Sequence, residues 1–391
     1  MTKVRIVGGG LAGVLAALEA HRLGARRIEI HERLGEVGGA LAPKVSHGVE
    51  LRDRWTVFGG REDPARRLLE WHGVRFDDVA LTCGSLNPCP RGGASAAKGF
   101  AGPVMTARDP SFGRLTGDTM ADRLRVYPDD VRTQLARYCR WRLGVWLDEA
   151  HASAALPLNI DQVRFAGTRA EEAPPLAALP KDGFTGLFAQ AARALEQLGV
   201  EVRLQSLVTP KEAIDSTDGI TVWAAAPAPL FSALGKSPPR LISDLTASYV
   251  FETRGGPPAP LLVQNYTARG AIYRLSLYPS RGETMLLAEC VEEVSDTDLR
   301  REIHELLGEF GGDTLKLGDT RAVFVQTRWD TPSMDSVRKL ANLRSALAEA
   351  RGPTFVAGAW EAVDPAERFR RLSRGLAGAL APELPLAQAA A

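Results

Sequence analysis

Residues 4–13 of this chain read VRIVGGGLAG, and residues 28–39 read IEIHERLGEVGG. The first stretch predicts a strand that turns through three glycines into a helix, and the second predicts a strand that ends at an acidic residue, Glu32. Glu32 follows the third glycine by about twenty positions, the spacing at which a carboxylate accepts ribose hydroxyls. This order of strand, glycine turn, helix, strand and acid is typical of a Rossmann-type dinucleotide-binding unit.

Each glycine of the first turn has its own role. Gly8 allows the tight turn, Gly10 lets the backbone approach a pyrophosphate, and Gly13 lets the helix pack closely on the sheet. The helix expected over residues 11–23 offers its first N–H groups and its partial positive charge to the diphosphate.

A second glycine pair, Gly38-Gly39, stands six and seven residues after Glu32. It gives the backbone another close approach to a ligand that continues past the adenosine, which favours FAD over NAD. An acid at position 32 also disfavours a 2′-phosphate, so NADP is not expected at this site.

Four stretches resemble one flavoprotein superfamily, which contains the flavin amine oxidases, protoporphyrinogen oxidases, phytoene desaturases and UDP-galactopyranose mutases. They are residues 7–39, 179–208, 220–227 and 353–375. In the second stretch a strand is similar to the one that delivers a residue, here Val208, to the adenine side of FAD. The last stretch is similar to the motif that closes over the ribityl chain and pyrophosphate.

The resemblance implies an α/β fold in which a Rossmann-type FAD-binding domain carries an inserted α+β substrate domain, made of a mixed sheet and helices. It implies noncovalent FAD, because no cysteine or histidine aligns with a position of covalent attachment. The cofactor-binding residues implied are Gly8, Gly10, Leu11, Ala12, Gly13, Glu32, Arg33, Gly38, Gly39, Ala40, Val208, Gly358, Ala359 and Phe369.

The chain departs from the superfamily pattern at three positions. Ala40 stands where an Arg or Lys is usual, Arg54 where a small residue is usual, and Ala359 where an Asp or Glu is usual. These departures leave three alternatives open: weaker FAD binding, a shifted flavin ring, or a protein that keeps the fold without the redox chemistry.

The length of 391 residues favours two domains. The FAD-binding domain is expected over the separate segments 1–55, 178–240 and 320–391, and the substrate domain over 56–177 and 241–319. Helices are expected at 62–71, 128–155 and 296–310, and strands of the substrate domain at 248–251, 271–278 and 285–289.

Composition excludes several classes of partner. With 48 basic and 47 acidic residues the charge is balanced, and no nucleic-acid partner is expected. The six histidines and four cysteines show no spacing typical of metal ligands, so no metal site is expected. No signal peptide and no apolar run long enough to cross a membrane is found, which favours a cytoplasmic protein with free thiols.

The residues that would contact the substrate are predicted from fewer features of the sequence than the cofactor-binding residues. Arg274 lies in an aromatic strand, where its guanidinium would either clamp a carboxylate or phosphate or face water at a strand edge. Arg54 and the nearby Arg52 would either reach the flavin face or pair with acids such as Asp53. Trp360 would either stack near the flavin ring or fill the boundary between domains.

The leading hypothesis is an FAD-dependent oxidoreductase that transfers a hydride from a small organic substrate, such as an amine, an amino acid or an unsaturated or cyclic metabolite, to the flavin. Oxygen or another acceptor would then take the electrons, and no catalytic acid or base is nominated. Two alternatives stay open: a non-redox, flavin-dependent isomerase that resembles UDP-galactopyranose mutase, and an accessory protein with a degenerate cofactor site.

Overall fold

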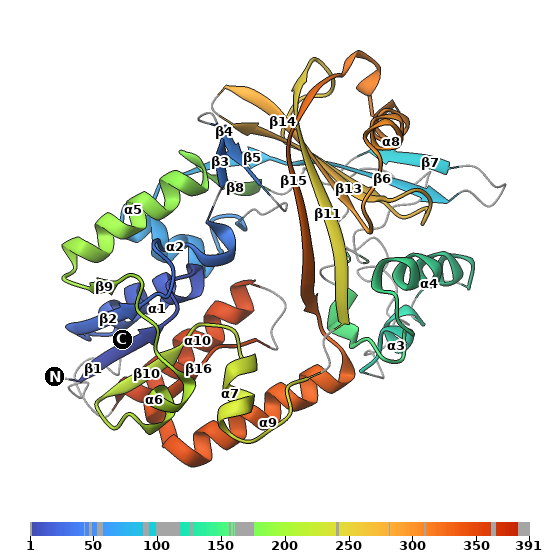
Figure 1. Cartoon of the computed structure of the whole chain (residues 1–391). Coiled ribbons are helices and arrows are strands. Elements are labelled where there is room, and N and C mark those ends of the chain that lie inside the picture. The colour runs from blue at the N-terminus through green and yellow to red at the C-terminus, as the bar shows by residue number, and fades with distance from the viewer. Residues whose placement is uncertain are drawn as a thin grey trace.

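The computed structural model describes residues 2–42, 44–46, 49–52, 58–88, 94–98, 118–125, 127, 129–155, 158, 160, 176–239, 242–280, 282–308, 310–360 and 365–381. Two sheets organise these residues, one parallel and one mixed, and Figure 1 shows them in separate halves of the molecule. The fold class is therefore α/β, as predicted.

The five-stranded sheet is parallel and has the order β16-β10-β1-β2-β9. Its strands are β1 (Lys3–Val7), β2 (Arg27–His31), β9 (Glu201–Arg203), β10 (Ile220–Trp223) and β16 (Phe355–Ala357). The central strand β1 pairs in parallel with both β2 and β10. This central strand is the one that runs into the first glycine turn, so the turn lies in the middle of the sheet edge.

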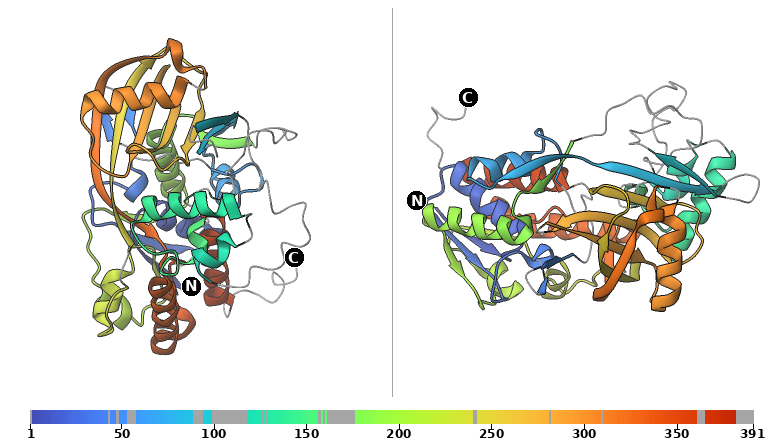
Figure 2. Two further views of the ribbon diagram at one scale, coloured as in Figure 1. Left: turned by 90° about the vertical axis from the view of Figure 1, so that its right-hand side faces the viewer. Right: turned by 90° about the horizontal axis from the view of Figure 1, so that it is seen from above.

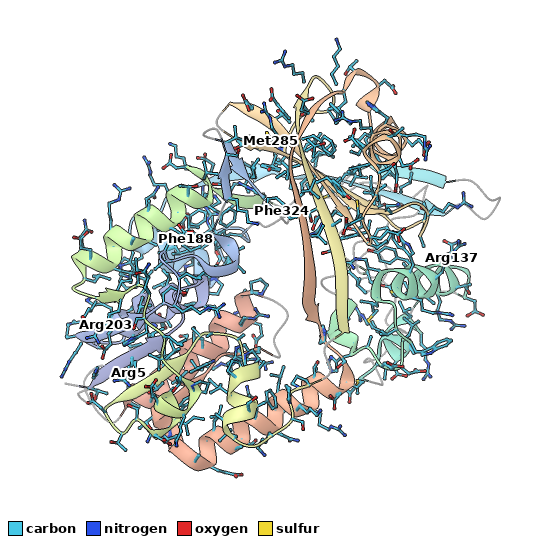
Figure 3. The ribbon with its side chains drawn as sticks, viewed as in Figure 1. Arg5, Arg137, Phe188, Arg203, Met285 and Phe324 are labelled. Atoms are coloured by element: carbon cyan, nitrogen blue, oxygen red, sulfur yellow. The ribbon has the colours of Figure 1, made fainter. Side chains whose placement is uncertain are left out.

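Helices cover both faces of this sheet. One face packs against α1 (Leu11–Arg22), α2 (Pro64–Trp71), α5 (Gly183–Gln197) and α10 (Pro365–Leu380) around a single hydrophobic core. The other face packs, over β10 and β16, against α6 (Pro210–Asp215), α7 (Ala228–Ala233) and α9 (Met334–Arg351). The remainder of that face carries charged side chains, among them Arg5 and Arg203 (Figure 3).

The seven-stranded sheet is mixed and has the order β15-β11-β14-β13-β12-β6-β7. Its strands are β6 (Thr82–Pro88), β7 (Ala94–Lys98), β11 (Ile242–Arg254), β12 (Leu261–Asn265), β13 (Ile272–Ser280), β14 (Glu283–Cys290) and β15 (Lys316–Thr331). Only the β12–β6 pair among them is parallel. Helix α8 (Asp296–Gly308) covers one face, and α3 (Met120–Leu124) and α4 (Asp129–Leu143) lie toward the other (Figure 2).

Short elements connect the two sheets. The chain passes from the second glycine pair through η1 (Gly39–Leu41) into a hairpin of β3 (Lys44–Ser46) and β4 (Val49–Leu51). A further two-stranded sheet joins β5 (Phe76–Ala80) to β8 (Leu176–Pro180). The remaining short helices are η2 (Ala152–Ala155), η4 (Gly312–Thr314) and η5 (Gly352–Thr354).

The structure confirms the three predicted strands of the mixed sheet and the helix predicted at 296–310. The single helix predicted over 128–155 is wrong in its second half, because α4 ends at Leu143 and Gly144 follows with φ +64°. A backbone in the left-handed region stops a helix, and glycine adopts that region without strain.

The division into two domains stays a prediction, and the packing of two elements departs from the expected segments. Helix α2, expected in the substrate domain, contributes Leu68 and Leu69 to the core of the five-stranded sheet. Strand β15 crosses the expected boundary at residue 320 and pairs with β11 up to Thr331. No helix among the described residues is both long and apolar enough to span a bilayer.

Candidate functional site

The first glycine turn is compact because Gly13 of α1 packs directly against the backbone of Gly8, which follows β1. Gly8 has φ +103°, and its N–H donates to the carbonyl of His31 at 2.8 Å. Helix α1 begins after Gly10, and a Cβ added at Gly13 would lie 1.8 Å from the carbonyl oxygen of Gly8. The geometry therefore agrees with the predicted roles of Gly8 in the turn and of Gly13 in packing, and the approach of a pyrophosphate to Gly10 stays a prediction.

The N-terminus of α1 keeps its first N–H groups available. Within the described part of the chain no side chain caps this helix, and its first turn contains no acidic residue. Its first residues, Leu11 and Ala12, follow the turn directly. Uncompensated N–H groups together with the helix dipole suit a phosphate.

The second glycine pair docks on the first. The N–H of Gly38 donates to the carbonyl of Gly9 at 2.9 Å, and Gly10 and Gly38 form an isolated parallel bridge. A Cβ added at Gly39 would lie 3.0 Å from the Cα of Gly10. Two turns that are separated in sequence thus form one backbone surface that carries no side chains.

Glu32 lies at the edge of this surface and is buried. Its Oε2 accepts from the N–H of Gly9 at 2.6 Å, and its Oε1 accepts from the N–H of Leu34 at 2.8 Å. Each carboxylate oxygen has a further lone pair, so the side chain can also accept ribose hydroxyls. The contact with Gly9 fixes the carboxylate beside the glycine turn, which the spacing in sequence did not reveal.

Val208, predicted on the adenine side, follows a segment that contacts Glu32, and Arg33 and Ala40 were predicted to bind the cofactor. The segment that leads to Val208 is held to β2 by the N–H of Ser206, which donates to the carbonyl of Glu32 at 2.8 Å. Val208 is half-buried against the cluster that contains Val7. Arg33 and Ala40 are both exposed.

The closing motif is tied to the neighbouring strand. The N–H of Gly358 donates to the carbonyl of Trp223 at 3.0 Å, and Ala359 is buried. Trp360 donates through Nε1 to the carbonyl of Ala225 at 3.1 Å and packs against the cluster of α7 and α9. The structure therefore gives Trp360 a packing contact within the half of the molecule that contains the five-stranded sheet. Neither a role near the flavin ring nor one at the boundary between domains follows from this contact, and both stay predictions.

Phe369 lies near the start of α10. Its side chain is buried in the core of the five-stranded sheet, with Val356 and Leu372. The apolar face of α10 directs this side chain inward. The assignment of Phe369 to the cofactor site stays a prediction.

A buried ion pair stands where the two sheets meet. Glu50 accepts from the N–H groups of Phe184 and Thr185, at the start of α5, at 3.2 and 3.0 Å. Arg52 donates to Glu50 at 3.3 Å, and its guanidinium lies 5.1 Å from the centroid of Phe184 and 4.7 Å from that of Tyr278. Arg52 thus pairs with a nearby acid, Glu50, as one of its predicted alternatives had it, and Asp53 lies outside the described residues.

Arg52 connects the two cores through its neighbours. Phe184 belongs to the core of the five-stranded sheet, while Leu51 packs with Met285 and Phe324 of the seven-stranded sheet (Figure 3). Burial raises the pKa of Tyr278 to about 12, so its phenol is neutral at physiological pH. Arg54 lies outside the described residues.

Arg274 does not present a free clamp. It forms a two-point ion pair with Glu289 of the next strand, with Nη2 and Oε1 2.7 Å apart, and Glu289 is fully buried. Tyr273 donates to the same carboxylate at 3.2 Å. The water-facing edge charge is therefore wrong, because the largely buried Arg274 is paired internally. The ligand clamp stays a prediction.

This pair belongs to a row of polar side chains that crosses the seven-stranded sheet. Directly paired positions place Ser85, Gln264, Arg274, Glu289 and Ser248 next to one another on five strands. Gln264 donates to the hydroxyl of Tyr138 on α4 at 2.6 Å. Sequence reasoning missed this row because each member looks like an isolated polar residue within its own strand.

Comparisons of the sequence with protein-family models and with curated proteins give no match. Solved structures do match over nearly the whole chain. A reduced UDP-galactopyranose mutase is 12% identical with a TM-score of 0.65, and covers 97% of this chain and 93% of its own. Cyclohexylamine oxidase from Brevibacterium oxydans IH-35A is 14% identical with a TM-score of 0.61, and covers 97% and 98%.

Wild-type putrescine oxidase bound to putrescine is 15% identical with a TM-score of 0.57, and covers 97% of this chain and 99% of its own. At these identities the likeness shows the fold. The chain therefore has the fold that the predicted resemblance implied.

Proposed function

We propose that this chain is an oxidoreductase that binds FAD without a covalent bond. The observation that carries the proposal is the docking of the Gly38-Gly39 turn on the Gly9-Gly10 turn, through the 2.9 Å hydrogen bond from Gly38 to Gly9. A single glycine turn serves many dinucleotides, whereas two joined turns offer an extended backbone surface to a longer ligand.

The described residues fit the cofactor at three points. The N–H groups at the start of α1 would bind the diphosphate, and Glu32 would hold the ribose. The absence of side chains at Gly10 and Gly39 leaves the backbone open to close approach. When bound, FAD would accept a hydride from a C–H bond of the substrate.

Amines are the substrate class to test first, because two of the matching structures are a putrescine oxidase and a cyclohexylamine oxidase. Amino acids and unsaturated or cyclic metabolites follow. The electrons would pass to oxygen or to another acceptor, and the active chain needs no nucleic-acid partner.

The first experiment is an absorbance spectrum of the purified protein from 300 to 600 nm, before and after acid precipitation. Flavin bands that move into the supernatant would support noncovalent FAD. Anaerobic mixing with putrescine, cyclohexylamine and amino acids then tests reduction, and bands that persist with every compound would count against an oxidase of these substrates.

A non-redox isomerase is the second candidate, favoured by the TM-score of 0.65 to the reduced mutase. Calorimetry with UDP-galactose, on dithionite-reduced protein, distinguishes it, since an amine oxidase has no reason to bind a nucleotide sugar. Arg274, which was predicted as a possible clamp for a phosphate, is paired with Glu289 and does not add support.

An accessory protein is the third candidate and draws on Ala40 and Ala359. A colourless protein that takes up no added FAD would favour it. A protein with stoichiometric, reducible flavin would remove its basis.

A further inference from the structure

A groove of about 750 Å³ lies behind the second glycine pair. One wall is α5, which contributes Ala189 and Ala192, and the opposite wall is the segment that contains Val37 and Ala42. Phe188 of α5, whose buried side chain is labelled in Figure 3, also lines the groove. The groove is therefore separate from the ligand-facing side of the glycine turns.

The lining is mostly apolar and in part exposed. Val45 and Leu204 line the groove with 50% and 43% of their surface exposed to solvent. Exposed apolar side chains beside a concavity mark a binding surface more often than scattered ones do. The volume is that of a site for a small organic molecule, for which about 300 to 1,000 Å³ is usual.

Two carboxylates stand on opposite walls of this groove. Glu36 belongs to the connecting segment and Glu196 to α5, and both are exposed. Within the described part of the chain, no ion-pair partner is found for either one. Arg193, a turn before Glu196, donates to the carbonyl of Ala189 and does not line the groove.

Two residues that line the groove also pack against the Gly38-Gly39 turn. A Cβ added at Gly38 would lie 3.0 Å from the Cβ of Ala42 and 3.2 Å from the ring of Phe188, and both residues line the groove. A molecule bound in the groove would therefore contact the residues that pack against Gly38, on the side of this turn opposite to Gly10.

We propose that this groove is a second binding site, for a small organic cation with an apolar body. The apolar lining would cover the body, and Glu36 and Glu196 would attract the positive group and disfavour an anion. A folded partner protein fits less well, since stable protein interfaces bury about 1,200 Å² or more. The site goes beyond the proposed oxidation and does not depend on it.

Calorimetry with decyltrimethylammonium, below its micelle concentration, tests the site in the full chain. The quaternary nitrogen cannot form an imine, so binding is read without turnover. Decanesulfonate, with the same chain length and the opposite charge, is the matched ligand. We expect the ammonium ion to bind at least tenfold more tightly than the sulfonate, and saturating FAD not to displace it.

Variants then place the binding in the groove. Ala192→Trp fills it and should weaken ammonium binding at least tenfold, while Glu36→Gln with Glu196→Gln should weaken it about two- to fivefold. Ala192→Leu repeats the first test with a smaller side chain. Ala341→Trp is the control, at an exposed alanine on α9.

Three outcomes would overturn the proposal. One is equal binding of the sulfonate and the ammonium ion. Another is unchanged ammonium affinity in Ala192→Trp protein that melts at the wild-type temperature. The third is displacement of the ammonium ion by FAD, which would place the probe in the cofactor site. None of these depends on whether the protein oxidises amines.

Discussion

Replacing Gly13 by alanine tests whether the first turn depends on contact between α1 and β1. The added Cβ would lie 1.8 Å from the carbonyl oxygen of Gly8 and 3.5 Å from the side chain of Ile6. Atoms pack at about 3.5 Å or more, so the helix must move away from the turn by more than about 1 Å. The clash is with a backbone oxygen, which cannot rotate away.

The magnitude follows from two opposing terms. Alanine is favoured over glycine in a helix by about 1 kcal/mol, whereas overpacking costs about 1–3 kcal/mol. Because the overlap is severe, we expect a net loss of about 2 kcal/mol in the free energy of unfolding. Displaced N–H groups would also lose hydrogen bonds to the diphosphate, which corresponds to about a hundredfold in FAD affinity.

Gly378→Ala is the matched control, since Gly378 lies within α10 and an added Cβ there meets nothing within 4 Å. This change should stabilise the protein by about 0.5–1 kcal/mol and leave FAD binding unchanged. Urea unfolding and FAD calorimetry on both variants give the comparison. If the Gly13 variant is as stable as the control and binds FAD equally well, the packing argument is refuted.

Three further predictions concern charges. Glu32→Gln keeps an oxygen that can accept from the backbone but loses the negative charge, so FAD affinity should fall about tenfold by calorimetry; an unchanged affinity would remove Glu32 from the site. Arg274→Met leaves the buried carboxylate of Glu289 without its cation and should cost about 3–5 kcal/mol in urea unfolding, whereas Arg274→Met with Glu289→Leu should recover most of that loss; equal losses would contradict the pairing. Burial opposes ionisation of Glu19, but the hydrogen bonds it accepts, led by that from Arg22, hold its pKa below 4.5. The resulting stability is present above pH 4.5 and is lost as the pH falls through the folded pKa, so Glu19→Gln should flatten the acid limb of the unfolding free energy; an unchanged limb would exclude this contribution.

Local signals in the sequence predicted the elements that adjacent residues specify. The glycine spacing in residues 8–13 predicted a turn whose geometry the structure reproduces. Alternating apolar residues predicted the strands of the mixed sheet, because successive side chains on a strand point to opposite faces. The end of α4 at Leu143 was missed because a single glycine does not always end a helix.

Contacts between distant segments were not predictable from one sequence. Glu289 pairs with Arg274 only because β13 and β14 align in a given register, which a bulge near Tyr273 shifts. Glu50 caps α5 from a strand 134 residues away. Nothing near these residues in the sequence identifies their partners.

The sequence by itself determined a strand, a glycine turn, a helix and a second strand that ends at Glu32, because these features arise from neighbouring residues whose chemistry is fixed by identity and spacing. The tertiary structure decided which charges remain available to a ligand. Folding brought the two glycine turns into contact. It also placed Arg274 in an ion pair with Glu289, and it left Glu36 and Glu196 at a groove. The physical reason is that the energy of a charge depends on its neighbours in space, and only folding sets those neighbours.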